Sequence, residues 1–99
     1  THTPGPWKVS LKDDTVVVDA NGAEVAMIDG DYNHPPTWPI MEANARLIAA
    51  APDLLDALAD MVSMYVRIAE SGDCGFWDPE KDDEVIAARA AIAKARGEI

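Results

Sequence analysis

The string "DGDYNH" carries the side chains that come nearest to a metal site in this sequence. Asp29, Asp31 and Asn33 have the alternating spacing that opens a calcium-binding loop. The remainder of such a loop is missing, because His34 stands where the glycine of the sharp turn belongs and Ile40 stands where the bidentate glutamate belongs. We therefore expect no bound metal at this string.

Catalytic chemistry has equally little support. Neither of the two histidines has a nucleophile motif beside it, and nothing in the sequence supports a pair formed by Cys74 and His34. The six glycines are scattered, with no strand, glycine-rich loop and helix in succession to hold a phosphate or a dinucleotide. Asp53, Asp56 and Asp60 fit the solvated face of a helix better than a pair of hydrolytic carboxylates. The sequence predicts a protein that is not an enzyme and binds no cofactor.

Aromatic residues gather in two expected loops, 29–39 and 71–78. Large aromatic side chains are the favoured anchors of protein interfaces, although in a thin domain they also cap the core. We expect the partner-binding residues to be these aromatics, the neighbouring histidine and the acidic helix face: Tyr32, His34, Trp38, Phe76, Trp77, Asp53, Asp56 and Asp60.

Composition narrows the class of protein. A chain of 99 residues with 48% hydrophobic residues predicts a single globular domain over 1–99. The net charge of −10 argues against nucleic-acid binding, which requires basic side chains to neutralise phosphates. The apolar runs are too short for a membrane span, and a single cysteine agrees with a reducing compartment. We expect a soluble, cytoplasmic protein.

The first third of the chain has the pattern of a sheet. Apolar and polar residues alternate from Trp7, and two further apolar segments flank an Asn-Gly pair that suits a type I′ hairpin turn. The predicted three-stranded antiparallel meander spans about 7–28, with strands at about 7–12, 15–20 and 23–28. Such a small sheet needs a covering layer of helices, so the expected fold class is α+β.

Helical spacing follows, with helices expected over about 40–51, 52–70 and 79–96 and packed on the sheet. Pro52 should open the second helix, and Asp78 should cap the third. The inward stripe of the first helix is expected to be Ile40, Ala43, Asn44, Leu47, Ile48 and Ala51. That of the second is expected to be Leu54, Leu55, Leu58, Met61, Val62, Tyr65, Ile68 and Ala69.

Three residues are expected to have structural roles. Trp7 should place a large apolar surface on the inner face of the sheet, and Pro52 should set the bend between two helices. Asn44 should be buried, with its amide bonded to backbone groups of the N-terminal segment.

Two motifs carry a resemblance to a known group. "HTPGPWKV" at 2–9 and "EANARLIAAAPDLLDAL" at 42–58 together resemble a pattern of small phage and prophage proteins, including the Ead-type early proteins of lambdoid phages. The resemblance covers about the first 60 residues. It implies a phage accessory protein acting in a bacterial cytoplasm, and it implies no known reaction or catalytic residue.

The function expected from these observations is that of a non-enzymatic phage accessory protein that binds a host protein, such as a defence or regulatory component. The alternative is an oligomer that binds or sequesters a signalling nucleotide. That alternative would need basic residues such as Arg46, Arg67 or Arg89 beside Tyr32 or Trp38. A homo-oligomer is compatible with both functions, and no nucleic acid or membrane is expected as a partner.

Overall fold

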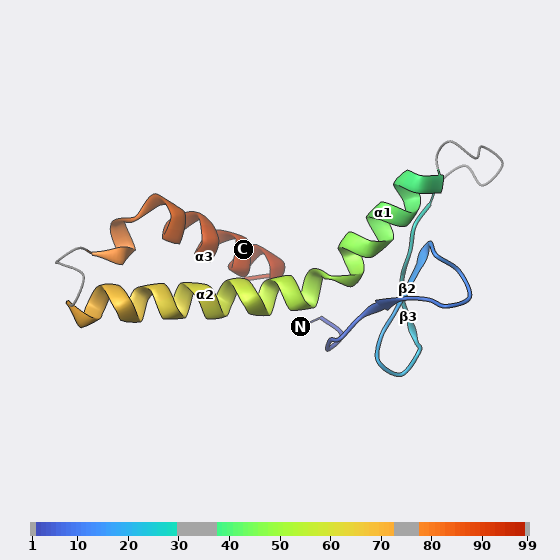
Figure 1. Cartoon of the computed structure of the whole chain (residues 1–99), viewed down its shortest axis with the longest axis horizontal. Coiled ribbons are helices and arrows are strands. Elements are labelled where there is room, and N and C mark those ends of the chain that lie inside the picture. Colours follow the sequence, from blue (N-terminus) through green and yellow to red (C-terminus); the bar gives the residue numbers. More distant parts are fainter. Residues whose placement is uncertain (1, 30–37, 73–77, 99) are drawn as a thin grey trace. The chain divides into compact units, whose positions relative to one another are not determined.

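The computed structural model describes residues 2–29, 38–72 and 78–98, and the chain divides into two compact units (Figure 1). The sheet unit comprises residues 2–53, and the helical unit comprises the residues from Leu54 onward. The single domain expected over the whole chain stays a prediction.

The sheet unit contains the predicted meander. Strands β1 (Lys8–Val9), β2 (Val16–Val18) and β3 (Glu24–Met27) pair antiparallel in the order β1-β2-β3, which confirms the expected α+β fold with its three-stranded sheet. Val17 lies opposite Val9 on one side and Ala26 on the other. The pairing of β2 with β3 is irregular between Val17 and Val18, so the strands are shorter than the alternation predicts.

Aspartate side chains build both turns of the sheet. In the first turn, Asp13 Oδ1 accepts hydrogen bonds from the Thr15 hydroxyl at 2.7 Å and the Thr15 backbone N–H at 2.9 Å, and these bonds lower the pKa of Asp13. In the second, Asp19 Oδ1 accepts from the backbone N–H groups of Asn21 and Ala23. Gly22 has a φ of 84° whereas Asn21 has no positive φ, so the expected type I′ turn is wrong.

Helix α1 (Trp38–Ala49) covers the sheet with small side chains. Met41, Ala45 and Ala49 recur every fourth residue and are its buried positions. Ala45 and Val17 are fully buried, so the helix and β2 approach closely. The core around them also includes Trp7, Val9, Val25, Ala26, Ile28 and Ile48.

The expected inward stripe of α1 is therefore wrong in most of its members. Ile40 and Leu47 are 62% and 65% exposed, and Asn44 is exposed as well. Asn44 has no buried amide to satisfy, so the expected stabilising role does not hold. Of the expected stripe, only Ile48 packs against the core among the described residues.

The N-terminal segment packs against the start of α2 (Ala51–Ser71). Pro52 is buried, and a Cβ atom added at Gly5 would lie 2.9 Å from the Cβ atom of Pro52. The Gly5–Pro6 peptide bond is cis. Half-buried Trp7 packs on the core and donates from its indole N–H to the Thr3 carbonyl at 3.1 Å. The two motifs that carry the phage resemblance therefore meet within the sheet unit.

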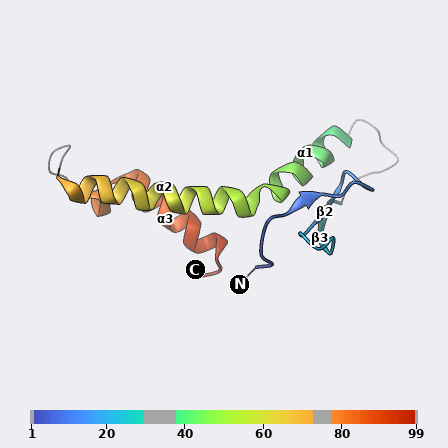
Figure 2. The same ribbon diagram turned by 60° about the horizontal axis from the view of Figure 1, so that its bottom comes forward.

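In the helical unit, α3 (Asp83–Ala95) lies alongside α2 in both views (Figure 1 and Figure 2). The short 3-10 helix η2 (Pro79–Lys81) precedes α3. Asp78 caps η2 and Asp82 caps α3, so the expected single helix over 79–96 is instead two elements with separate acidic caps. Within the described part of this unit, the buried residues are Ala69, Pro79, Val85 and Ile92. None of the described helices combines the length and the apolarity that a membrane span requires.

Candidate protein-binding surfaces

An apolar face of α1 points away from the sheet. Ile40 and Leu47 are two turns apart on the side of the helix opposite Met41, Ala45 and Ala49. Both side chains are more than half exposed, although neither is needed for the core of the unit. We call Ile40 and Leu47 the open face of α1. Exposed large apolar side chains that recur on one helix face are typical of a surface that another molecule covers.

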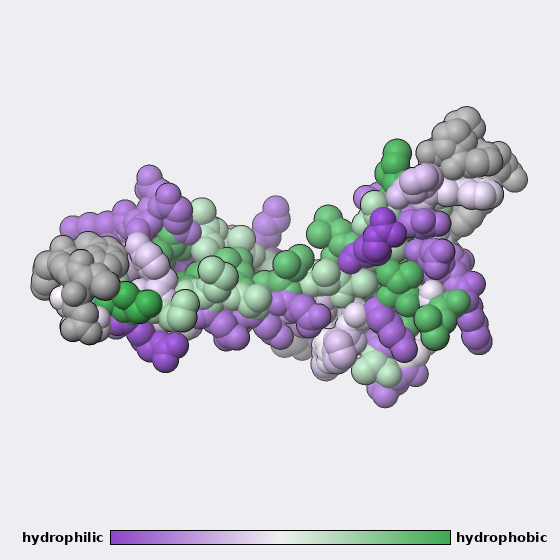
Figure 3. Space-filling view, in the orientation of Figure 1, coloured by the Kyte–Doolittle hydropathy of each residue, from purple (hydrophilic) through white to green (hydrophobic). Residues whose placement is uncertain are grey.

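A longer apolar face runs along α2. Leu54, Ala57, Met61, Met64 and Ile68 follow one another at spacings of three, four, three and four residues, and all five are exposed. We call these five residues the open face of α2. The exposed fraction reaches 64% at Met61 and 50% at Met64, in the middle of the face. The space-filling view shows apolar surface along α2 bordered by hydrophilic surface (Figure 3).

Helix α3 covers a different side of α2. Val62, Val66 and Ala69 of α2 are at least partly buried, as are Val85 and Ile92 of α3. The broad apolar stripe expected on α2 thus divides into a part that packs within the unit and a part that stays open. Leu54, Met61, Tyr65 and Ile68 belong to the stripe that the sequence predicts as inward, and the structure leaves them exposed.

A polar contact fixes the start of α3 on α2. The Tyr65 hydroxyl donates to Asp82 Oδ2 at 2.6 Å, while Asp82 Oδ1 accepts from the Glu84 backbone N–H at 3.1 Å. Hydrogen bonding with Glu84, and then with Tyr65, holds the pKa of Asp82 below its ordinary value. A single carboxylate therefore caps one helix and binds the other.

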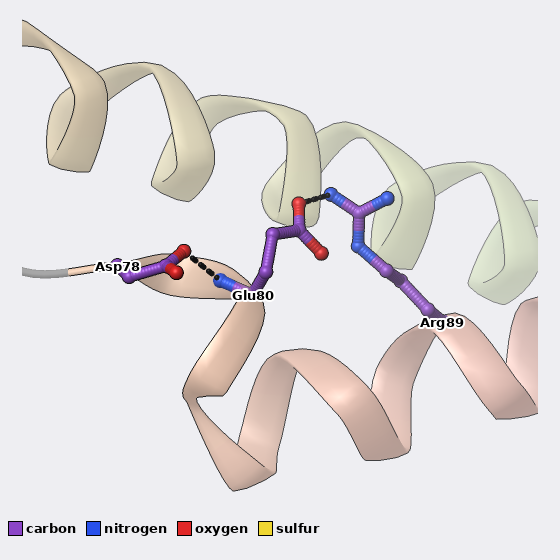
Figure 4. A network of polar contacts seen from close by, with 3 residues as sticks. All are labelled: Asp78, Glu80 and Arg89. Carbon is purple, nitrogen blue, oxygen red and sulfur yellow. Dashed lines mark hydrogen bonds and ion pairs between the residues drawn. The ribbon is translucent and has the colours of Figure 1, made fainter.

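A second polar network joins η2 to α3 (Figure 4). Arg89 Nη2 donates to Glu80 Oε1 at 2.8 Å, and Asp78 Oδ1 accepts from the Glu80 backbone N–H at 3.0 Å. Both members of the ion pair are about half exposed, so water and salt screen their attraction.

A groove of about 530 Å³ between α2 and α3 is rich in arginine. Arg67, Arg89 and Arg96 line it, above a floor that includes Val62 and Ile92. Guanidinium groups around an apolar floor suit a planar molecule that carries phosphate. Two of these arginines already have favourable interactions within the chain. Arg89 binds Glu80, and Arg96 lies at the C-terminal end of α3, where the helix dipole favours a cation.

Among the described residues, four of the expected partner-binding residues, Trp38, Asp53, Asp56 and Asp60, are exposed. Trp38 is the first residue of α1 and is 44% exposed, so it is part of a helix and not of a loop. Asp53, Asp56 and Asp60 are exposed on α2. Tyr32, His34, Phe76 and Trp77 lie outside the described residues, as does Cys74.

Sequence reasoning missed the two open faces because both lie on helices with more than one apolar side. The number of large apolar side chains could have indicated these faces, because the sheet and α3 do not cover all of them. The uncovered ones include Ile40, Leu47, Met61 and Met64. Among the described residues, no three His, Cys, Asp or Glu side chains come together as metal ligands. The calcium-like string continues past Asp29 into residues outside the described ones.

Of the comparisons with known proteins, the one with protein families identifies a match. No curated protein and no solved structure matches the chain. Over residues 1–99 the sequence matches the family described as Salmonella phage P22 protein Y8K6, and the chain therefore belongs to this phage protein family.

Proposed function

We propose that this phage protein is a non-enzymatic accessory protein that binds a host protein in the bacterial cytoplasm through the open face of α1. The observation that carries the proposal is the exposure of Ile40 and Leu47 on the side of α1 opposite the core. More than half of each side chain stays in water in the folded protein, whereas a partner that covers them would remove this apolar surface from water.

The chemistry of the partner follows from the charge. The chain has 18 acidic and 8 basic residues, so a molecule that approaches this surface passes through a negative electrostatic field. The host protein should therefore present an apolar patch with a basic rim, such as a defence or regulatory component that itself handles nucleic acid. The resemblance of the first 60 residues to Ead-type early proteins supports an accessory role in infection.

A pull-down from bacterial lysate tests this function. The tagged protein should retain a host protein in fixed ratio, and Leu47→Asp should abolish its retention because it places a charge in the apolar contact. Ala20→Asp is the matched control, since Ala20 is exposed in the β2–β3 turn of the same unit and the change in charge is the same. Equal capture by both variants would contradict docking through α1.

The second candidate function is the binding of a signalling nucleotide in the groove lined by Arg67, Arg89 and Arg96. The presence of three arginines along one groove of a strongly acidic chain favours it. Calorimetric titration with a cyclic dinucleotide and with adenosine monophosphate tests it. Binding that Arg67→Ala and Arg96→Ala each weaken would support the groove, and no heat of binding with either nucleotide would remove this candidate.

A further inference from the structure

The open face of α2 has the pattern of a helix that pairs with a copy of itself. Side chains that recur at alternating spacings of three and four residues form a narrow seam, and two such seams interlock when their helices lie side by side. We propose that α2 pairs antiparallel with α2 of a second copy of this chain, through Leu54, Ala57, Met61, Met64 and Ile68. The proposal concerns the helical unit and goes beyond the host contact assigned to α1.

An antiparallel pair has a two-fold axis, which sets the register. In such a pair, the residue numbers of two side chains that lie opposite each other always add up to the same value. Each layer of the seam joins a residue that is followed by a step of three residues to one that is followed by a step of four. Met61 then lies opposite the partner's Met64, and Ala57 opposite the partner's Ile68. A large side chain meets a small one at Ala57, and two flexible methionines fill the centre of the pair.

Charges beside the seam select this direction. Asp60 and Arg67 are exposed and both lie on the edge of the seam next to Ala57 and Met64. Equivalent edges meet in an antiparallel pair, so Asp60 faces the partner's Arg67, and the two-fold axis repeats the pair. In a parallel pair, the edge that carries Asp60 and Arg67 would instead face the edge that carries Leu58 and Tyr65. Neither charge would then lie beside a charge of opposite sign.

The size of the face indicates the strength of the pair. Its four large side chains are 43–64% exposed and together present several hundred Å² of apolar surface, less than the roughly 800 Å² per partner of a typical stable interface. The dimer should therefore depend on protein concentration. Its α3 helices would lie along the other edge of the seam, where Leu58 and Tyr65 line a groove of about 480 Å³.

Sedimentation equilibrium over a range of concentrations is the first test. The wild-type protein should show a reversible monomer–dimer equilibrium, and Met61→Asp should raise the dissociation constant at least about tenfold by placing a carboxylate in the centre of the seam. Ala20→Asp is the matched control, because Ala20 is exposed in the β2–β3 turn and lies outside both open faces. It should leave dimerisation unchanged. Circular dichroism checks that both variants keep their helices.

A charge exchange provides a variant set that leaves the apolar face intact. Asp60→Arg and Arg67→Asp should each weaken the dimer, because each places like charges opposite one another across the edge. The double variant Asp60→Arg/Arg67→Asp should restore the wild-type dissociation constant at low salt. Failure of the double variant to recover would contradict the Asp60–Arg67 pairing.

Cross-linking decides the direction. In a Cys74→Ser background, chains carrying Leu54→Cys should form a disulfide with chains carrying Ser71→Cys, and neither variant should cross-link with itself. Position 54 of one chain is about 25 Å from position 54 of the other in the antiparallel register, from a rise of 1.5 Å per residue. Self-cross-linking of Leu54→Cys alone, or a monomer at every concentration, would overturn the proposal.

Discussion

The two units of this protein bury their apolar side chains in opposite ways. In the sheet unit, α1 places two alanines and a methionine on the sheet, and its core contains the fully buried Val17 and Ala45. In the helical unit, α2 keeps Leu54, Met61 and Met64 in solvent. Among the described residues of that unit, the sites of firm contact are a few buried side chains and the polar link from Tyr65 to Asp82.

This difference indicates that substitutions of apolar side chains should have different effects in the two units. The sheet unit draws its stability from its own packing, so changes of volume in its core should act on folding. The helical unit leaves apolar surface exposed, so changes on its open face should act on the proposed association and not on folding.

The same substitution should act on folding in one unit and on association in the other. Ala45→Leu should destabilise the sheet unit by about 1–3 kcal/mol, because the added atoms meet a closely packed core. Ala57→Leu adds the same atoms to the exposed face of α2 and should leave the free energy of unfolding nearly unchanged while weakening self-association, because the added atoms meet the partner's Ile68. Urea denaturation followed by circular dichroism measures the first effect, and sedimentation measures the second. Equal loss of stability in both variants would contradict the contrast.

Gly5→Ala tests the contact between the N-terminal segment and Pro52. The new Cβ atom would lie 2.9 Å from the Cβ atom of Pro52, so one segment must shift, at a cost of roughly 1 kcal/mol. The melting temperature should fall, and the NMR signals of α3 should stay in place because the contact lies within the sheet unit. A melting temperature equal to that of the wild type would mean that the two segments are not in contact.

The pH dependence of the two units should depend on two aspartates. Asp82 has a pKa in the folded state below its ordinary value of 3.8, so it stabilises the helical unit above that value, and the contribution disappears as the pH falls through the lowered pKa. Asp13 acts in the same direction in the sheet unit. Asp82→Asn should make the α3 amide signals less sensitive to acid below about pH 4, and Asp13→Asn should change only the signals of the sheet. Tyr65→Phe should reproduce part of the Asp82→Asn effect.

The smallest effect is expected for the ion pair in Figure 4. Arg89→Ala should lower the free energy of unfolding by at most about 0.5 kcal/mol, because both side chains are about half exposed. The loss should vanish in 1 M salt when thermal melts of the variant and the wild type are compared. A large, salt-independent loss would show that the Arg89 side chain contributes through packing instead.

Much of the fold was accessible from the sequence because local rules determine it. The alternation of residues around Val9 and Val17 predicts the sheet, and Pro52 marks the start of the second helix within one residue. The start of the third helix was misplaced because Asp78 and Asp82 are both suitable caps, and the sequence does not show that Asp82 also binds Tyr65. The Asn-Gly turn was misassigned because Asp19 bonds the backbone of the turn.

The open faces of α1 and α2 were harder to predict from the sequence. The spacing of apolar residues locates the apolar faces of a helix, but it does not show which face the rest of the protein covers. In α1 the larger residues Ile40 and Leu47 suggested the core, whereas close approach to the sheet requires the smaller Ala45 and Ala49. In α2 the apolar arc is wider than one neighbouring helix can cover. The predicted binding residues Tyr32, His34, Phe76 and Trp77 lie outside the described residues and stay predictions.

The two methionines at the centre of the open face of α2 also make it sensitive to oxidation. Met61 and Met64 expose their thioethers to solvent, and a sulfoxide is polar where the thioether is apolar. An oxidant would thus change the chemistry of this face with no change in the backbone of α2, and a methionine sulfoxide reductase would reverse it. Under the proposed pairing, oxidation of Met61 and Met64 should therefore weaken association through α2.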